Sequence, residues 1–245
     1  MDDLCGQAAV LAGLAGLLHG FGRRSGPPGL ENREATAART ASLLAPAGKL
    51  LLLRQVHGAA VERAPWSGRP VADAAVAFEP GLLLGIETAD CLPVLLVDSH
   101  RRAVAAAHAG WRGTAAGVTR AAVAALVSAG SSPTDLVAAL GPAIGPCCYE
   151  VGEDVRAAFG PPGAAYFEPT ANGRHHLDMR AATRRQLIES GLDPSRIGGL
   201  DECTFCRSDL YHSYRRDGPG SGRMISFVGY EAAIGASTPS RPAPG

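Results

Sequence analysis

The sequence lacks a net charge and lacks long apolar runs. Its 245 residues carry 23 acidic and 23 basic side chains, so we expect neither a uniform basic surface for nucleic acid nor an acidic tract for storing cations. No stretch reaches the roughly 18 uninterrupted apolar residues that a membrane-spanning helix needs, because charged residues or Gly-Pro pairs interrupt every run. These absences exclude nucleic acid and membrane as expected partners and favour a small molecule.

The sequence also lacks the features of a secreted protein. Its apolar opening segment, residues 1–18, begins Met-Asp-Asp and has no positively charged region before it, which a signal peptide requires. Six cysteines in a chain of this length do not resemble the dense disulfide framework of a small secreted scaffold. We therefore expect a cytoplasmic protein, in which packing, metal binding or catalysis must explain each thiol.

The pattern of apolar residues predicts one catalytic domain over residues 1–234. Val- and Leu-rich runs alternate with Ala-rich amphipathic stretches, which is typical of a mixed α/β architecture. We expect strands at 50–55, 82–87, 93–97, 103–108, 136–140 and 224–228, and helices at 33–44, 114–129, 154–159 and 179–190. Asp178 is placed to cap the last helix and Gly191 to follow its end. The Pro- and Ser-rich residues 235–245 have nothing to bury and are expected to form a disordered tail.

One predicted hairpin brings two metal-binding residue types together. The polar residues 98–101 interrupt two apolar runs, which indicates a turn. If the turn is centred after Ser99, paired residue numbers sum to 199 and Cys91 lies opposite His108. Opposed residues share a face with Cβ atoms about 5 Å apart, close enough to bind one ion. A turn of odd length would place Ala109 opposite Cys91 instead.

A hairpin supplies two ligands, so a metal site needs a third from elsewhere. His57 follows a Leu-rich run and is the best candidate, although spacing alone does not place it near the hairpin. Two histidines, one cysteine and a water are typical of a catalytic zinc site, and copper also accepts such ligands. Each of these residues taken alone is more simply explained as a core residue.

Five segments resemble the motifs of one bacterial family. They are residues 55–58 (Gln-Val-His-Gly), 88–94 (Thr-Ala-Asp-Cys-Leu-Pro-Val), 107–113 (Ala-His-Ala-Gly-Trp-Arg-Gly), 140–152 (Leu-Gly-Pro-Ala-Ile-Gly-Pro-Cys-Cys-Tyr-Glu-Val-Gly) and 213–218 (Ser-Tyr-Arg-Arg-Asp-Gly). The family has been called multicopper polyphenol oxidoreductase or laccase-like, peptidoglycan editing factor, and zinc-dependent purine nucleoside phosphorylase. The resemblance extends from His19 to Gly229.

The resemblance implies an α+β fold, a single-domain layered sandwich of mixed β-sheets flanked by helices. It implies that His57, Cys91 and His108 bind Zn²⁺, and that the chain phosphorolyses adenosine, inosine and methylthioadenosine and deaminates adenosine. Its partners would then be a nucleoside and phosphate. The stretch at 22–31 is shorter than the family pattern, which puts the substrate range in question if the missing loop walls the pocket.

The two implied reactions need different side chains. Deamination needs a carboxylate that moves protons beside a metal-activated water, and Asp90 is the nearest candidate, although strand alternation would point it away from Cys91. Glu87 and Glu150 are weaker candidates for this role. A structural hydrogen-bonding role for Asp90 is an equally good interpretation.

Phosphorolysis needs arginines that hold an anion through paired N–H groups. Arg112, Arg215 and Arg216 are the first candidates and Arg24 the next, and His212 is a candidate for contact with the purine or its sugar. A solvated arginine or a structural ion pair is the alternative interpretation for each arginine.

Other functions remain open at this stage. Laccase chemistry needs a trinuclear copper cluster with many imidazoles, and none of the seven histidines forms an H-x-H pair. A cysteine hydrolase would use Cys91 as nucleophile and His108 as base, and a zinc hydrolase would cleave amides of a peptidoglycan precursor. A zinc-stabilised binding module would need a fourth ligand, for which Cys147, Cys148 and His212 are candidates. Both a monomer and a homodimer are compatible with the sequence.

The remaining cysteines have weaker signals. Cys203 and Cys206 form a C-x-x-C, which is typical of half a zinc site or a redox pair, but the other half is not evident. Cys147 and Cys148 are adjacent rather than spaced as chelating partners. We interpret all four as structural or redox-accessible thiols.

Overall fold

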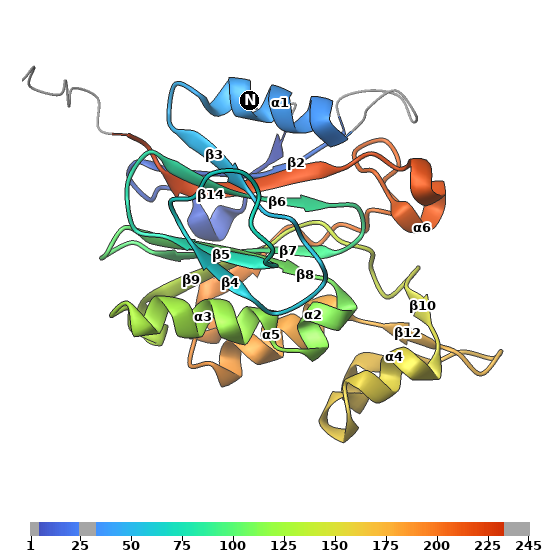
Figure 1. Cartoon of the computed structure of the whole chain (residues 1–245). Coiled ribbons are helices and arrows are strands. Elements are labelled where there is room, and N and C mark those ends of the chain that lie inside the picture. Colours follow the sequence, from blue (N-terminus) through green and yellow to red (C-terminus); the bar gives the residue numbers. More distant parts are fainter. Residues whose placement is uncertain (1–4, 25–32, 233–245) are drawn as a thin grey trace, which may run out of the picture.

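The computed structural model describes residues 5–24 and 33–232 (Figure 1). The expected tail at 235–245 and most of the shortened stretch at 22–31 lie outside the described residues. No helix in the described part of the chain is long and apolar enough to cross a membrane.

Two mixed β-sheets stack face to face (Figure 1). The first has the strand order β1 (Cys5–Gly6), β2 (Leu17–Gly22), β14 (Met224–Tyr230), β6 (Leu82–Thr88) and β3 (Lys49–Leu52). The second has the order β13 (Ile197–Gly199), β9 (Leu136–Leu140), β7 (Leu92–Asp98), β8 (Ala103–Ala109), β5 (Ala74–Ala77) and β4 (Val61–Arg63). Each sheet combines parallel and antiparallel pairs.

The central strands are buried on both faces, which explains their continuous apolar sequences. Along β7, Leu95 and Val97 belong to the core between the two sheets, whereas Val94 and Leu96 belong to the core beneath the helices. Because side chains alternate between the two faces of a strand, β7 contributes residues to both cores.

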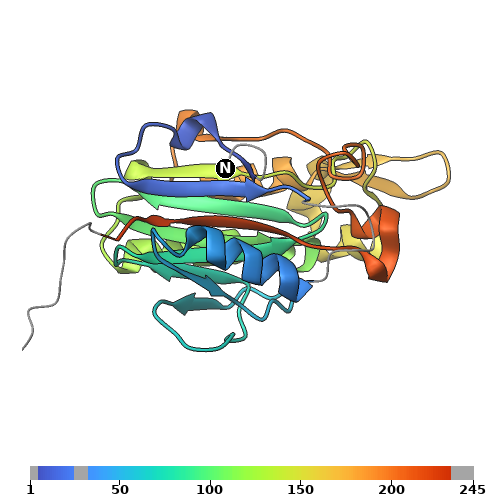
Figure 2. The same cartoon turned by 90° about the horizontal axis from the view of Figure 1, so that it is seen from above.

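Helices cover the outer faces of both sheets. Helix α1 (Arg33–Leu44) lies across the five-stranded sheet (Figure 2), where Ala37 packs with Leu52 and Ile225. Helices α2 (Trp111–Ala115), α3 (Val118–Ser128) and α5 (Met179–Glu189) cover the six-stranded sheet (Figure 1). The four layers confirm the expected α+β sandwich of mixed sheets flanked by helices.

A small third sheet lies beside one end of the sandwich (Figure 1). It consists of β10 (Glu150–Val151), β12 (His175–Leu177) and β11 (Phe167–Pro169), with α4 (Glu153–Ala158) against it. Helix α6 (Tyr214–Asp217) lies at the same end of the molecule. The described residues also include five 3₁₀ turns, at Ala9–Leu11, Pro133–Asp135, Pro161–Tyr166, Pro194–Arg196 and Gly218–Gly220.

The helices expected at 33–44, 154–159 and 179–190 are present as α1, α4 and α5, and capping residues mark the ends of α5. Asp178 caps α5 by accepting a hydrogen bond from the Ala181 amide at 2.8 Å, and Gly191 follows its end with a φ of 95°. The single helix expected at 114–129 is wrong, because Gly117 takes a φ of 84° and separates α2 from α3. The strand expected at 50–55 ends early, at Leu52.

The hairpin between β7 and β8 exists, but its predicted register is wrong by two residues. Pro93, not Cys91, lies opposite His108. The turn is longer than expected, since Asp98 pairs with Ala103 and accepts hydrogen bonds from two backbone amides inside the turn. A shift of two residues keeps every side chain on its original face of the sheet, so the predicted face of His108 was unaffected by the error.

Candidate metal centre

Three segments bring the predicted metal-binding residues together. His57 lies in the loop after β3, Cys91 directly precedes β7, and His108 lies near the end of β8. Their donor atoms all lie within 4.8 Å of one another, and the two imidazole rings meet edge to face with centroids 4.8 Å apart. The group has the donor types and the spacing that a metal ion requires.

Asp73, which the sequence analysis missed, organises two of these residues. Its fully buried carboxylate accepts hydrogen bonds from the amides of Val56 (3.1 Å), His57 (2.8 Å) and Gly58 (2.7 Å). The same carboxylate contacts Nδ1 of His108 at 2.8 Å. This contact places the His108 proton on Nδ1 and leaves Nε2 as the donor to a metal, which is the usual arrangement of carboxylate-supported histidine ligands.

The sequence did contain a signal for Asp73. It is the one charged residue in the apolar stretch 71–78, and a charged residue is rarely buried without a partner. Burial acts to raise its pKa, but hydrogen bonds from His108 and from the amides of Gly58 and Val56 outweigh burial, so the pKa lies below its ordinary value. Asp73 therefore stays ionised beside the histidine.

Gly110 leaves room for the donor atoms. A Cβ atom at this position would lie 3.0 Å from the Cys91 sulfur and 3.0 Å from Cδ2 of His57. These distances are tighter than ordinary van der Waals contact, so any side chain at 110 would displace the group.

The charges of Cys91 and His108 support each other. Burial acts to raise the pKa of Cys91, but the charge and hydrogen bond of His108, followed by those of His57, outweigh burial and lower it to about 6. Burial likewise acts to lower the pKa of His108, but the Cys91 charge and Asp73 raise it to about 9. The cysteine is thus a thiolate at neutral pH, which is the form that binds a metal.

The three residues open into a cavity of about 510 Å³, a volume typical of small-molecule sites. Aromatic and apolar side chains form part of its wall, among them Trp111, Ile144, Tyr149, Met179 and Tyr214. Charged and polar side chains form the rest, among them Arg33, Gln55, Glu87, Asp90, Arg215 and Arg223. The cavity therefore combines flat apolar surfaces with several cations.

Glu87 is buried in the cavity wall and holds Arg33 in place. Arg33 donates from Nε and Nη2 to its two carboxylate oxygens at 2.9 and 2.6 Å, and Arg69 donates to one of them at 2.6 Å. The Gln55 side-chain amide donates to the backbone carbonyl of Glu87 and accepts a hydrogen bond from the backbone N–H of Glu87. The Glu87 carboxylate is thus neutralised by two arginines.

Comparison with known proteins identifies the family of this chain. The family model described as multi-copper polyphenol oxidoreductase laccase matches residues 29–231. The chain belongs to this family. It is 39% identical over 214 residues to a protein of Deinococcus radiodurans named purine nucleoside phosphorylase, covering 87% of this chain and 82% of that protein.

Two further similar proteins extend the comparison. The crystal structure of YlmD from Geobacillus stearothermophilus has a TM-score of 0.83 and 30% sequence identity, and the match covers 94% of this chain and all of that one. That protein is named purine nucleoside phosphorylase YlmD. RL5, from an unknown prokaryotic organism, is named adenosine deaminase and is 38% identical over 163 residues, covering 64% of this chain and 61% of RL5.

In this chain Asp90 lies in the cavity wall, but both oxygens of its carboxylate accept hydrogen bonds from other protein groups. One oxygen accepts a hydrogen bond from the Thr204 hydroxyl at 2.6 Å, and the other accepts from the Ser213 hydroxyl at 3.0 Å and the Arg215 amide at 2.7 Å. Asp90 has a φ of 84° and precedes β7, so strand alternation does not apply to it. These bonds fasten two loops to the edge of the cavity.

Arg215 is the one predicted arginine that lines the cavity. Its guanidinium lies 5.3 Å from the centroid of the Tyr149 ring, and its Nη1 donates to the Glu150 carbonyl at 2.9 Å. The other lining arginines, Arg33 and Arg223, were not predicted. Their sequence positions, 33 at a helix start and 223 before a strand, carry no motif that would have identified them.

The other predicted arginines lie outside the described cavity lining. Arg216 donates to the carbonyls of Thr204, Phe205 and Tyr211 and to the Asp217 carboxylate. Arg24 donates to the Ser208 carbonyl at 2.6 Å. Arg112 is exposed and stacks on the Trp111 ring at 4.2 Å.

His212 is 1% exposed and also lies outside the described lining. Among the described residues, the metal-binding group at the cavity consists of His57, Cys91 and His108. His212, Cys147 and Cys148 therefore do not supply a fourth donor to it. Cys147 and Cys148 instead belong to a second group, with Cys203 and Cys206. The missing half of the C-x-x-C pair is therefore found in the tertiary structure.

Proposed function

We propose that this chain is a zinc-dependent purine nucleoside phosphorylase that also deaminates adenosine. The observation that carries the proposal is the group of His57, Cys91 and His108 in the wall of a cavity whose described lining also includes three arginines and three aromatic rings. The names of the relatives from Deinococcus radiodurans and Geobacillus stearothermophilus support phosphorolysis. The name of RL5 supports deamination as the second activity.

Zinc fits the donor set better than copper in a multicopper cluster. One thiolate and two imidazoles form a three-ligand site of the catalytic kind. Asp73 orients His108, and Gly110 leaves room for Cys91 and His57. Among the described residues, the two groups able to hold a metal contain two histidines between them, far fewer than a trinuclear copper centre uses. Bound zinc would supply a Lewis acid and an activated water in the cavity.

The arginines of the cavity suit phosphate. Arg33 uses two of its nitrogens on Glu87 and retains Nη1, and Arg215 uses Nη1 on Glu150 and retains Nε and Nη2 among the described contacts. Glu87 pairs with both Arg33 and Arg69, so this group keeps one net positive charge. The oxygens of Asp90 are occupied by protein hydroxyl and amide donors. An anion held by paired N–H donors is the expected occupant.

The aromatic rings of the cavity suit a purine. Trp111, Tyr149 and Tyr214 offer flat apolar surfaces near the three metal-binding residues, and such rings bind heteroaromatic bases by stacking. We assign Asp90 a positioning role, because it accepts hydrogen bonds from the Ser213 hydroxyl and the Arg215 amide and so holds the start of α6 at the cavity. Arg24, Arg216 and His212 would support the surrounding loops, and Arg112 would hold Trp111.

The proposal is tested by separating the products of two reactions. Zinc-loaded protein is incubated with adenosine, inosine or methylthioadenosine, with and without phosphate, and the products are resolved by chromatography. Free base and ribose 1-phosphate that appear only with phosphate report phosphorolysis, and inosine formed from adenosine without phosphate reports deamination. Absence of turnover of every nucleoside by zinc-loaded protein would overturn the proposal.

A pair of arginine variants locates the phosphate. Arg215→Met should raise KM for phosphate roughly 10–100-fold, the cost of losing charged hydrogen bonds of about 1.5–3 kcal/mol, and should spare deamination. Arg112→Met is the matched control, because Arg112 is exposed and stacked on Trp111, and its KM for phosphate should change little. Equal effects of the two variants would contradict the assignment of Arg215.

A cysteine hydrolase remains the competing function, since Cys91 and His108 also form a charged thiolate–imidazole pair. Full activity after chelation, together with loss of activity on thiol alkylation, would favour that alternative. None of the six cysteines forms a disulfide, which fits a reducing compartment, and we propose the cytoplasm as the site of action.

A further inference from the structure

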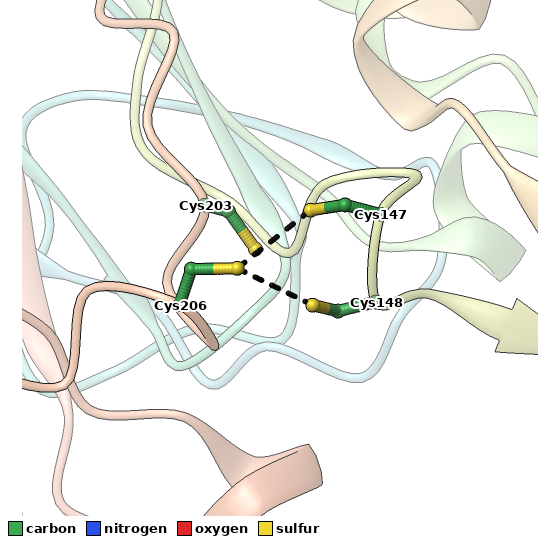
Figure 3. Close-up of side chains that lie close together, drawn as sticks. All are labelled: Cys147, Cys148, Cys203 and Cys206. Carbon is green, nitrogen blue, oxygen red and sulfur yellow. Dashed lines mark hydrogen bonds between the residues drawn. The ribbon is translucent and has the colours of Figure 1, made fainter.

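Four cysteines from two distant segments converge on one point. Cys147 and Cys148 lie in a turn between β9 and β10, and Cys203 and Cys206 form a C-x-x-C turn between β13 and α6. Figure 3 shows the four side chains pointing toward one another. Their sulfur atoms all lie within 4.8 Å, at a place distinct from the group of His57, Cys91 and His108.

The sulfur spacings are those of a tetrahedral metal site. The Cys206 sulfur lies 3.8 Å from that of Cys147 and 3.4 Å from that of Cys148. Four thiolates around zinc, each with a Zn–S bond of about 2.3 Å, would lie roughly 3.8 Å apart. A disulfide needs about 2.05 Å, and none of these four cysteines forms one.

The backbone around the sulfurs is already arranged as in a ligand site. The Gly145 amide donates to the Cys203 sulfur at 3.2 Å, a contact that stabilises a thiolate ligand as other outer contacts do in metal sites. The two segments are joined at Ala143, whose carbonyl accepts from the Thr204 amide at 3.0 Å and whose amide donates to the Glu202 carbonyl at 3.2 Å. These backbone hydrogen bonds therefore fix the positions of the two cysteine-containing turns relative to each other.

We propose that Cys147, Cys148, Cys203 and Cys206 bind a second, structural zinc ion. Four protein donors leave no open position, which is the property that separates structural zinc sites from catalytic ones. Zinc suits four thiolates without any redox chemistry, and it would join two segments of the chain that are more than 50 residues apart.

The second zinc ion would hold one wall of the cavity. Cys148 is followed directly by Tyr149, which lines the cavity. Thr204 lies inside the C-x-x-C turn and donates to Asp90, the neighbour of Cys91. Loss of the second ion should therefore loosen this wall and lower thermal stability.

Metal content decides the proposal without any assay of activity. Untagged protein purified under reducing conditions should contain two zinc ions per chain by mass spectrometry. Cys203→Ser/Cys206→Ser should contain one, His57→Ala/His108→Ala should also contain one, and Cys5→Ser, which changes a buried thiol outside both groups, should contain two. A wild-type content of one zinc that is unaffected by Cys203→Ser/Cys206→Ser would overturn the second site while leaving the proposed function intact.

X-ray absorption of the His57→Ala/His108→Ala protein keeps the test decisive if the cysteine variant fails to fold. The remaining zinc should show only sulfur neighbours, at about 2.3 Å. Cobalt substitution of the same protein should give the intense visible bands of a tetrahedral thiolate site. Nitrogen or oxygen neighbours, iron in place of zinc, or a disulfide among the four cysteines in freshly reduced protein would each refute the proposal.

Discussion

Asp73→Asn tests whether the buried carboxylate, rather than the three donors alone, builds the metal centre. Asp73 accepts four hydrogen bonds, two at each oxygen. Asparagine has the same shape, but its amide nitrogen donates instead of accepting. Whichever oxygen position the NH₂ group of the new asparagine takes, the two N–H donors that face that position lose their acceptor.

The magnitude follows from the number of bonds. Two lost hydrogen bonds to a charged group, at about 1.5–3 kcal/mol each, should lower the free energy of unfolding by roughly 3–6 kcal/mol. Loss of the carboxylate behind a histidine ligand should also weaken zinc binding roughly 10–100-fold. The first effect is measured by urea unfolding of the metal-free protein, the second by competition with a chromophoric chelator.

Asp98→Asn is the matched control, because Asp98 is equally buried and also accepts backbone hydrogen bonds. One oxygen accepts both of them, from His100 and Arg101, so asparagine keeps them, and the residue lies at the far end of the same hairpin from the metal centre. Its zinc affinity should equal that of the wild type. Wild-type zinc affinity in Asp73→Asn would refute the orienting role, and an unchanged free energy of unfolding would refute the hydrogen-bond count.

Three further predictions concern the same molecule. Gly110→Ala should lower the zinc content, because its Cβ would lie 3.0 Å from donor residues Cys91 and His57, whereas Gly220→Ala, with nothing within 4 Å, should not. Chelation should abolish both nucleoside reactions and added zinc should restore them, and activity that survives chelation would contradict a zinc enzyme. Burial holds the pKa of His19 below its ordinary 6.5, so the unfolded chain binds more protons below pH 6.5 and stability falls as the pH drops through that range. His19→Gln should show a shallower fall in melting temperature over the same range, and identical slopes would contradict the cause.

Local patterns in the sequence determined much of the architecture. The apolar runs of β6, β7, β8, β9 and β14 were found because strands buried on both faces are almost continuously apolar. The ends of α5 were found because Asp178 and Gly191 mark them chemically. The hairpin placed His108 on the correct face despite its wrong register, because a two-residue error preserves the alternation of side chains.

Contacts between distant segments were decided only by the tertiary structure. Asp73 meets residues 56–58 and His108, and nothing in the sequence around it names these partners. The arginines could not be ranked from motifs, because Arg215 and Arg216 are neighbours in the sequence yet one lines the cavity and the other is bonded to loop carbonyls.

The cysteines show most clearly which features the sequence determined and which only the tertiary structure decided. The sequence determined that His57, Cys91 and His108 were candidates, since their motifs resemble those of a family, but it did not relate Cys147 and Cys148 to Cys203 and Cys206. Pairing of β9 with β13, together with the bridge between Ala143 and Cys203, brings those segments side by side. Spacing along a chain reports only local geometry, whereas a metal site depends on distances that the packing of the whole fold sets.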